Sequence, residues 1–596
     1  MSDLLQTAVA YHQAGNAVEA EGAYRAFLAG QPHHRDALRF LGGLYLQMGR
    51  PAEAVDYLNR AVAINADVET LTNLGIALRG AGRGAESLAA CERALKAAPH
   101  TSAARRNYAA ALFLAGKIDA AIAWYHQALD ADPDDLSALI NLGLAYSDIG
   151  RGDAAAPWLA QAQARLEQIA AANPSDAATL NQLGTILQRQ GKLQDALPPY
   201  RRALEIQPGY AQAALNLATC LRALGHPAEA VDMCRYAIGL MPDSSDAYTN
   251  LGVFLQETAR HDDAVAAFEN ALRLNPNSLL AKRNMSFSLL ALGRYDEGWA
   301  MHETGLGITS MRGKNPFPER RWTGQDVTGK RLLIWCEQGM GDDLQFIRYA
   351  PLCKARGCTL AVQCPAPLRR LFATVSGIDR LVDHVGADDF DVHASLMSLP
   401  YIFGTRLETV PAQGPYLRAP DDARAQWAAL FPARTGNLRV GLVWAGNPHE
   451  NQINAHLTDR RRSMALETLR PLFDVAGVDF YSLQMGAAAV AQIDVCGLRS
   501  RIADIMGDVR DFADTAAIIE NLDLVISVDT SVVHLAGGLG KPVWVMSRFD
   551  ACWRWLQNRP DNPWYPSARV FGQPAPGDWA SVVDRVAAAL AAFKTP

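Results

Sequence analysis

The pattern of apolar, small and polar positions divides the chain into two parts. Through about the first three hundred residues, apolar residues and alanines recur at helical spacing between short turns that contain glycine or proline. After Gly305 this pattern stops, and short apolar runs alternate with helix-like stretches. The first part therefore predicts pairs of α-helices, and the second predicts parallel β-strands joined by helical crossovers.

The helical part is an array of similar segments. The stretch 41–67 returns, with changes, at 74–100, 183–209 and 251–277. A small residue occupies the same place in each copy, with successive steps of 34, 33, 34, 34, 41, 34, 34 and 34 residues, at Ala8, Gly42, Gly75, Ala109, Gly143, Gly184, Ala218, Gly252 and Ser286. A 34-residue period is the tetratricopeptide signature, and it predicts eight repeats and a truncated ninth near residues 279–303.

Stacked repeats of this kind form a solenoid with a concave groove. We expect the groove to bind a protein segment; the alternative is a spacer or a dimerisation surface. The second helix of a repeat often ends before a proline, and prolines stand at the matching places, Pro32, Pro99, Pro133, Pro208, Pro242 and Pro276. The 41-residue step adds about seven residues near 161–173, which lengthen one helix or its loop.

The second part contains apolar runs that predict strands of parallel sheets, at 331–336, 358–364, 440–446, 478–484, 522–528 and 542–547. They fall into two sets, so we expect an N-terminal Rossmann-like half at 331–415 and a C-terminal Rossmann-like half at 437–596, facing one cleft. A linker at 306–330, rich in proline, glycine and charge, joins the first half to the repeats of 1–305, and a hinge at 416–436 joins the two halves.

Composition and charge exclude several classes of protein. The formal net charge is −6 and the pI about 6.1, so the basic footprint of a nucleic-acid-binding protein is missing. Nine cysteines without a CxxC pair argue against a zinc site or a disulfide framework and for a reducing compartment. The N-terminus lacks the pattern of a signal peptide, and no run of about 18 apolar residues exists. We therefore expect a cytoplasmic protein.

The first strand of the second part leads into a glycine turn with two acids, "EQGMGDD" at 337–343. Gly339 and Gly341 are expected to allow a tight turn and a close backbone approach at the carboxyl end of the strand, where such sheets bind their ligands. Asp342 and Asp343 then begin the next helix. The alternative is that both aspartates only complement the helix dipole.

A second motif, "DLVISVDTSVVHLAGGLGKPVWVM" at 523–546, places a strand end directly before a small-residue helix. A helix N-terminus has free N–H groups and a positive dipole end, which suit a phosphate. Asp529, Thr530 and Ser531 stand at that N-terminus, and His534 lies in its first turn. We expect this group to contact a phosphate-bearing ligand, with a structural histidine as the alternative.

Two further segments carry candidate residues. In "VWAGNPHENQINAHLTDRRRSM" (443–464), Asn447 follows a strand end and a later run of arginines, Arg460 to Arg462, is suited to bidentate phosphate binding. The alternative for the run is a solvated charge cluster. The aromatic stretch 550–566, with Arg554 among its tryptophans, is either a cleft wall or a segment that seals the core.

The motifs E-Q-G-x-G-D, W-A-G-N-P, D-R-x-R-S, Y-S-L-Q and S-V-D-T-x-x-x-H-x-A-G-x-x-G-K-P, in this order, resemble those of bacterial tetratricopeptide-coupled glycosyltransferases. The catalytic half of that group is similar to the heptosyltransferases and has the GT-B fold. The architecture is also similar to that of the O-GlcNAc transferases and, among bacterial proteins, to flagellin glycosyltransferases that attach a nonulosonic acid. The resemblance covers essentially the whole chain, and its most specific part is D-T-x-x-x-H-x-A.

The resemblance implies roles for individual residues. Asp342 stands where the heptosyltransferases have their proposed base, and Glu337 is the next candidate. Asp529, Thr530 and His534 stand where that family contacts the donor diphosphate. The chain departs from the pattern at Ser531, where glycine is usual, and in its arginine cluster, where a lysine is common. We also expect donor contacts from Gln484 of the Y-S-L-Q motif.

The activity that the resemblance implies is inverting, metal-independent transfer to a protein hydroxyl, because a helix dipole and basic side chains stabilise the leaving phosphate. No cofactor is expected; the donor is a nucleotide-sugar, and a CMP-linked sugar would carry one phosphate where other donors carry two. The acceptor is a Ser or Thr of a protein bound by the repeats, such as flagellin. Two rivals remain: transfer to a lipid or glycan with the repeats as an assembly scaffold, and a non-catalytic interaction protein with a degenerate GT-B domain.

Overall fold

The computed structural model describes residues 2–305, 318–336, 339–448, 453–557, 559 and 561–593. The chain forms two compact units, Met1–Cys220 and Leu221–Pro596. The division falls within α13 (Ala211–Ala223). Among the described residues no helix is both long enough and apolar enough to cross a membrane.

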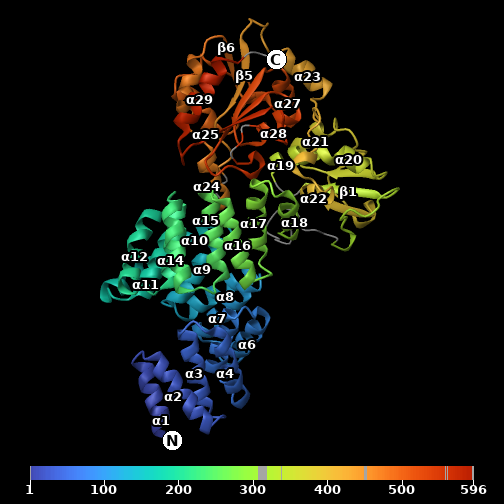
Figure 1. Ribbon diagram of the computed structural model, residues 1–596. Helices are drawn as coiled ribbons and strands as arrows, with labels where there is room; N and C mark the ends of the chain where they lie inside the picture. The colour runs from blue at the N-terminus through green and yellow to red at the C-terminus, as the bar shows by residue number, and fades with distance from the viewer. Residues whose placement is uncertain are drawn as a thin grey trace. The chain divides into compact units, whose positions relative to one another are not determined.

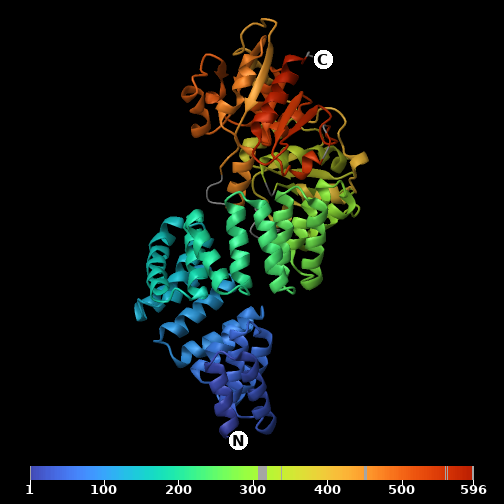
Figure 2. The same cartoon turned by 60° about the vertical axis from the view of Figure 1, so that its left-hand side comes forward.

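The first unit is entirely helical in its described part, with successive helices packed as hairpins (Figures 1 and 2). Its helices before α13 are α1 (Ser2–Gln13), α2 (Ala17–Gly30), α3 (Arg35–Gln47), α4 (Pro51–Ile64), α5 (Val68–Gly80), α6 (Gly84–Ala97), α7 (Ser102–Leu114), α8 (Ile118–Ala131), α9 (Leu136–Asp148), α10 (Gly152–Ala172), α11 (Ala177–Arg189) and α12 (Leu193–Ile206).

The small residues of the repeat pattern mark the places where the two helices of a hairpin touch. A Cβ built on Gly42 would lie 2.6 Å from a side-chain atom of Leu58, and one on Gly184 would lie 2.7 Å from the ring of Tyr200. In the second unit, a Cβ built on Gly252 would lie 2.5 Å from the ring of Phe268. In each case the partner is the residue sixteen positions later, so the small residue is what lets the two helices approach.

The remaining features of the repeat prediction are also met. Each predicted proline lies two residues beyond the end of a second helix; Pro32 follows α2 and Pro133 follows α8. The extra residues of the 41-residue step lengthen α10 to 21 residues, where most of the other second helices have 14. The ninth repeat is a helix pair, α17 (Leu279–Ala291) and α18 (Tyr295–Gly305).

The second unit begins with the last helical hairpins and continues into two parallel sheets. Its remaining hairpin helices are α14 (Pro227–Leu240), α15 (Ser245–Glu257) and α16 (His261–Leu274). The strands are β1 (Arg331–Trp335), β2 (Thr359–Gln363), β3 (Arg380–Val382), β4 (Val392–Ser395), β5 (Leu438–Val443), β6 (Val478–Ser482), β7 (Ile502–Asp504), β8 (Leu524–Val528), β9 (Val543–Ser547) and β10 (Ala568–Gly572).

Both sheets have the strand order of Rossmann-type folds. The first is ordered β3-β2-β1-β4 and the second β10-β9-β8-β5-β6-β7, and every pair is parallel. The order of the second sheet reverses direction between β5 and β8, as in doubly wound folds. The six predicted strands are confirmed, whereas β3, β4, β7 and β10 were not predicted.

Helices lie between and around the strands of each sheet (Figure 1). They are α19 (Met340–Phe346), α20 (Ala350–Lys354), α21 (Ala366–Phe372), α22 (Leu399–Ile402), α23 (Asp421–Ala428), α24 (Ile453–Arg462), α25 (Ala487–Val490), α26 (Gln492–Val495), α27 (Phe512–Glu520), α28 (Ser531–Gly538) and α29 (Trp579–Ala591). Alternate residues of the strands in the second sheet face different cores: Ile526 packs toward α29, whereas Val525 lies in the core that contains α27 and α28.

The last repeat shares a hydrophobic core with the sheets. Tyr295 and Trp299 of α18 are buried together with Phe346, Trp553 and Trp564. The rings of Trp299 and Trp553 lie 5.3 Å apart, and the indole N–H of Trp564 donates to the Tyr295 hydroxyl at 2.8 Å. The compact units therefore divide at residue 220, whereas the sequence predicts a boundary at 305.

The predicted linker and hinge are also more structured than expected. Residues 306–317 lie outside the described part, but Trp322 and Val327 are buried, and the Trp322 N–H donates to the carbonyl of His393 at 2.7 Å. The predicted linker at 306–330 therefore packs onto the first sheet over its described portion. The predicted hinge at 416–436 contains α23, whose Trp427 is 1% exposed.

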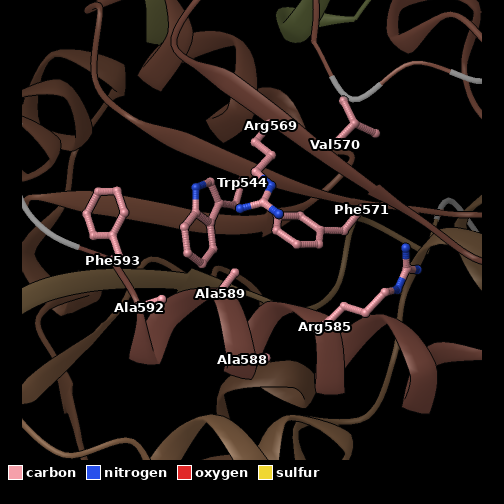
Figure 3. Close-up of a pocket in the computed structure, with 9 residues that line it drawn as sticks. All are labelled: Trp544, Arg569, Val570, Phe571, Arg585, Ala588, Ala589, Ala592 and Phe593. Atoms are coloured by element: carbon pink, nitrogen blue, oxygen red, sulfur yellow. The ribbon is translucent and has the colours of Figure 1, made fainter.

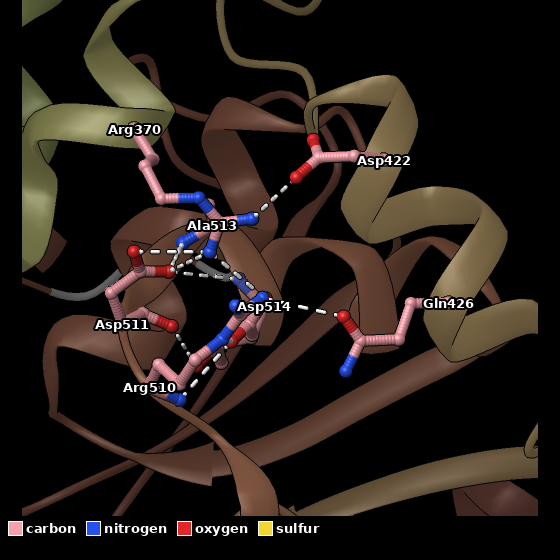
Figure 4. Close-up of polar contacts among 8 residues, drawn as sticks. Arg370, Asp422, Gln426, Arg510, Asp511, Ala513 and Asp514 are labelled. Carbon is pink, nitrogen blue, oxygen red and sulfur yellow. Dashed lines mark hydrogen bonds and ion pairs between the residues drawn. The ribbon is translucent and has the colours of Figure 1, made fainter.

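An ionic cluster joins the two sheet-bearing halves (Figure 4). Arg370 of α21 donates to Asp511 and Asp514 beside and within α27, each at 3.1 Å, and to Asp422 of α23 at 3.0 Å. Arg510 donates to Asp514 at 2.9 Å. Burial alone would raise the pKa of the fully buried Asp514, but the hydrogen bonds from Arg510 and Arg370 outweigh it and hold the pKa below its usual range.

Candidate functional site

The ends of two central strands meet at the candidate site. α19 follows β1 in the first sheet and α28 follows β8 in the second, and both strands adjoin the point where the strand order reverses. Ligands of open parallel sheets bind outside such points. α19 packs against α28, so the turns that the sequence singled out separately lie together.

Gly341 is the contact that allows this approach. A Cβ at this position would lie 2.9 Å from Cδ2 of His534 and 3.5 Å from Cα of Ser531. Any side chain would therefore push the two helices apart. Gly339 has φ −80° and ψ 152°, a conformation open to any residue, so the left-handed freedom of glycine is not used in this turn.

Asp342 faces a buried arginine from the other half of the fold. One carboxylate oxygen, Oδ1, is paired with Nη2 of Arg554, and the side chains are 17% and 11% exposed. Among the described residues, the other oxygen, Oδ2, receives a single long hydrogen bond of 3.3 Å from the backbone N–H of Gly339. Arg554 is further fixed by Gln345 Oε1 at 2.7 Å. Oδ2 is thus the oxygen of Asp342 that remains for a substrate.

A cavity of about 310 Å³ lies directly beside this pair. It is bounded by helices of the last repeats, by α19 and α24, and by the segment that follows β9. Its lining residues are Val253, Gln256, Glu257, His261, Phe287, Asp342, Thr458, Arg461, Arg548, Asp550, Ala551, Cys552, Trp553 and Arg554. All of them belong to the second compact unit, so repeat and sheet residues form one site.

The charged residues of the cavity are ion-paired, but among the described residues two arginines keep buried donors without a hydrogen bond, Arg461 through Nε and Arg548 through both Nε and Nη1. Arg461 contacts Glu257 at 3.1 Å and Asp550 at 3.2 Å, and Arg222 also holds Glu257. Arg548 has only the carboxylate of Asp550 at 3.5 Å, and its buried Nε and Nη1 make no hydrogen bond to the described residues. Buried guanidinium donors are normally satisfied, so Arg548 is suited to an anionic group of a ligand.

A larger surface groove of about 670 Å³ lies between α29 and the edge of the second sheet (Figure 3). Trp544, Phe571 and Phe593 form its apolar floor, and Arg569 lies over the ring of Phe571 at 4.6 Å. None of the residues predicted to bind donor or acceptor lines it. The smaller cavity, which contains Asp342, is therefore the candidate site.

His534 has a different environment from the one expected of a phosphate ligand. Its ring is 5% exposed, stacks on Trp555 at 5.5 Å, and its Nδ1 is hydrogen-bonded to the Tyr565 hydroxyl at 2.9 Å. Burial, and then the charges of Arg554 and Arg348, lower its pKa well below the usual value. The imidazole is therefore neutral and part of the packing between α28 and the aromatic stretch.

The other residues at the N-terminus of α28 are more accessible. Thr530 is the N-cap but makes no side-chain capping bond; its hydroxyl lies 3.1 Å from Ser527 Oγ instead. Ser531, the first residue of the helix, is half-buried, and Asp529 accepts from Arg462 through its backbone carbonyl at 3.3 Å. Their role as donor ligands stays a prediction.

The predicted residues of the β5 and β6 loops are divided between structural and exposed positions. Gln484 is 2% exposed. Its side-chain oxygen accepts hydrogen bonds from the backbone N–H groups of Trp444 and Ala445, and its side-chain nitrogen donates to the carbonyls of Ala445 and Met485. It therefore shapes the loop that carries Asn447. The amide atoms that would bind a donor are already used by these backbone contacts. The exposed Asn447 and Arg460 lie apart from the cavity lining, whereas Arg462 is bound to Asp459 at 2.9 Å.

The aromatic stretch both seals the core and forms a cleft wall. Trp555, Trp564 and Tyr565 are at most 1% exposed and seal the core, while Trp553 and Arg554 line the cavity. Arg548, Asp550, Glu257 and His261 were not predicted. Only the arginine-and-aspartate pair of "SRFDACWRW" at 547–555 offers a sequence signal, because the repeat residues come from nearly three hundred positions away. Glu337 lies outside the described residues.

Comparisons with known proteins identify the repeats. Family models for the tetratricopeptide repeat match residues 11–73, 72–135, 134–208, 181–247 and 245–278. The chain is 30% identical over 303 residues to protein FlbA of Caulobacter vibrioides, covering 46% of this chain and 49% of FlbA. The chain thus spans about half the length of that relative.

Two solved structures share weaker likeness with the chain. The Cut9–Hcn1 hetero-tetramer of APC/C is 17% identical, with a TM-score of 0.34, and the match covers 46% of this chain and 52% of that one. A tetratricopeptide repeat protein from Parabacteroides merdae is 17% identical, with a TM-score of 0.32, covering 43% and 98%. By the family models, the N-terminal part of the chain consists of tetratricopeptide repeats, which generally mediate binding between proteins.

Proposed function

We propose that the chain is a GT-B glycosyltransferase that moves a sugar from a nucleotide-sugar to a Ser or Thr hydroxyl of a protein bound by its repeats. The observation that carries the proposal is the packing of α19 against α28, which brings the switch points of the two parallel sheets together, while Asp342 of α19 also lines a cavity that contains arginines. Nucleotide ligands bind at such points, and charged cavities between two halves suit group transfer.

In the proposed reaction the acceptor hydroxyl oxygen attacks the anomeric carbon of the donor sugar. The new C–O bond forms as the bond to the donor phosphate breaks, and the electron pair leaves with the phosphate. Oδ2 of Asp342 takes the hydroxyl proton. The N–H groups at the start of α28 and the guanidinium of Arg548 would stabilise the leaving phosphate.

Arg548 replaces His534 in this proposal as the principal side chain for the donor phosphate. The reason is that Nε and Nη1 of Arg548 are buried without a hydrogen bond to the described residues, whereas Nδ1 of His534 is engaged by Tyr565. By the resemblance that the sequence motifs carry, the acceptor is proposed to be flagellin and the sugar a nonulosonic acid carried by CMP. The cavity contacts support an anionic donor.

The test is intact-mass analysis of flagellin incubated with the full-length chain and a CMP-linked nonulosonic acid. A mass increase of one sugar residue per modified site, dependent on both components, is the expected result. Binding of the CMP-sugar without any mass change in flagellin would point to another acceptor. Failure to bind CMP-sugars and other nucleotide-sugars alike would reject the transferase proposal.

A further inference from the structure

The last repeats supply an uncharged wall to the cavity. Val253 and Gln256 of α15, His261 of α16 and Phe287 of α17 face the same space as Asp342. The charged residue on this side, Glu257, is neutralised by Arg222 and Arg461. Residues 548–554 supply Arg548 and Arg554 to the lining, and α24 supplies Arg461. The cavity therefore has a charged face and a neutral, partly polar face.

His261 is the polar group on the neutral face whose bonding is incomplete. It is 7% exposed, and its buried Nε2 makes no hydrogen bond to the described residues. Its Nδ1 lies 3.4 Å from Ser288 Oγ, which also accepts a hydrogen bond from Gln256 Nε2 at 2.8 Å. Burial lowers the pKa of His261 to about 4, so the ring is neutral near pH 7. A second amide N–H of Gln256 is held by the Asn284 carbonyl.

We infer that this wall contacts the acceptor, and that Nε2 of His261 hydrogen-bonds the acceptor hydroxyl that is to be glycosylated. The inference rests on the proposed function and adds to it that the repeats hold the acceptor inside the catalytic cavity. The buried Nε2 needs a partner, and the neutral surroundings of Val253, Gln256 and Phe287 suit an uncharged group better than an ion.

A hydroxyl fits whichever ring nitrogen carries the proton. If Nδ1 donates to Ser288, Nε2 accepts from the incoming O–H; if Ser288 donates to Nδ1, Nε2–H donates to the same oxygen. In either case His261 orients the hydroxyl while Oδ2 of Asp342 takes its proton. An ammonium group would pair with only one of these forms.

Two substitutions at this position separate the inference from a purely structural role. Glutamine places a polar atom near the place of Nε2, whereas asparagine places one near Nδ1 and leaves the place of Nε2 empty. We expect His261→Asn to raise the KM for flagellin about tenfold, the effect of one lost neutral hydrogen bond, with CMP-sugar affinity unchanged. His261→Gln is expected to recover most of the loss.

The experiment measures initial transfer rates by intact mass while the flagellin concentration is varied, with full-length protein and a CMP-linked nonulosonic acid. Calorimetric titration with the CMP-sugar is run in parallel. The inference is overturned if transfer occurs but His261→Asn has the same acceptor KM as wild type. It is also overturned if His261→Asn is the better of the two variants, since Nδ1 and Ser288 would then be what matters. If wild type neither transfers sugar nor binds the donor, the proposed function fails first and the inference with it.

Discussion

The repeats before residue 220 and those after it follow the same sequence rule but are held by different neighbours. In both regions a small residue meets a side chain sixteen positions later, as Gly184 meets Tyr200 and Gly252 meets Phe268. In the first region repeats pack against repeats. In the second, Tyr295 and Trp299 pack into the same core as Trp553 and Trp564, and His261 lines the cavity with Asp342. A repeat can therefore share a compact unit with the sheets without any change in its own period.

Truncation should give the largest effect. A fragment of residues 221–596 is expected to melt cooperatively, because it keeps the compact unit whole. A fragment of residues 306–596 should lose its cooperative transition and bind a hydrophobic dye, because removing α17 and α18 exposes Trp553 and Trp564. Near-ultraviolet circular dichroism during heating would follow both. If both fragments showed equally cooperative thermal transitions, the domain boundary would lie at residue 305 instead.

Trp299→Ala should be the most damaging single substitution in the last repeat, lowering the stability of the second unit by about 3–5 kcal/mol. The matched change in the first unit is Tyr125→Ala, since Tyr125 is 3% exposed within repeats alone. We expect Trp299→Ala to lower the melting temperature of the unit at residues 221–596. Tyr125→Ala should lower the melting temperature of the unit at residues 1–220. Domain-resolved hydrogen exchange would measure each effect. A loss of protection in the first unit on Trp299→Ala would contradict the division.

Asp514→Asn tests the ionic cluster between the sheet-bearing halves, and we expect it to cost about 2 kcal/mol at neutral pH. Because the pKa of folded Asp514 is lowered, its contribution is present above the unfolded value of about 4 and is lost as pH falls below it. The free energies of unfolding that denaturant titration gives for wild type and variant should therefore become equal under acid conditions. The exposed Asp561→Asn is the control and should leave the midpoint unchanged. A difference that persists undiminished far below the unfolded pKa would assign the effect to packing.

Glycine substitutions give the smallest expected effects and test the rule that both regions share. Gly184→Ala and Gly252→Ala should each destabilise their own unit by about 1–3 kcal/mol, because the new methyl group meets an aromatic ring. Gly22→Ala in α2 is the control: its Cβ would enter open space, so it should stabilise by about 0.5–1 kcal/mol. Thermal unfolding measures all three. Stabilisation by all three would mean that the paired helices are less closely packed than these distances require.

The sequence predicted the elements better than it predicted their association. The 34-residue period and the longer apolar runs predicted the repeats and six strands, because each is a local pattern. β3 and β7 have three residues each and β4 is partly polar, so they lack a pattern of their own. The compact units divide at residue 220 although the period runs on unchanged to residue 305, and Tyr295 and Trp299, which join the last repeat to the sheets, stand inside the periodic part.

The candidate site shows the same limit. Strand ends and helix starts singled out Asp342, Thr530 and Ser531 from local patterns; Asp342 lines the cavity, whereas the donor role of Thr530 and Ser531 stays a prediction. The partners of such residues could not be found that way: Arg554 reaches Asp342 from 212 positions away, and Tyr565 occupies Nδ1 of His534 from 31 positions away. Gln484 was expected to bind the donor, but its amide is used by the backbone of the neighbouring loop. Which polar groups are left for a ligand is decided by tertiary contacts.

Asp343 also illustrates why a neighbour in sequence is not always a suitable control. From helical spacing it is expected to point away and to tolerate substitution more easily than Asp342. The structure leaves it 2% exposed, so Asp343→Asn would change a buried group. Glu297 of α18, which is exposed and paired with Arg294, is a better reference for a charge change that leaves the site untouched.

The most direct measurement is the rate of sugar transfer to flagellin by Asp342→Asn, followed by intact mass with a CMP-linked nonulosonic acid as donor. Asparagine keeps an oxygen for Arg554 but cannot take the hydroxyl proton, so we expect the rate to fall about a hundred- to ten-thousandfold. Glu297→Gln should transfer at the wild-type rate, and the melting temperature of Asp342→Asn should show that it is folded. Transfer by folded Asp342→Asn at the wild-type rate would contradict the account, because the cavity beside Asp342 would then not be where the reaction occurs.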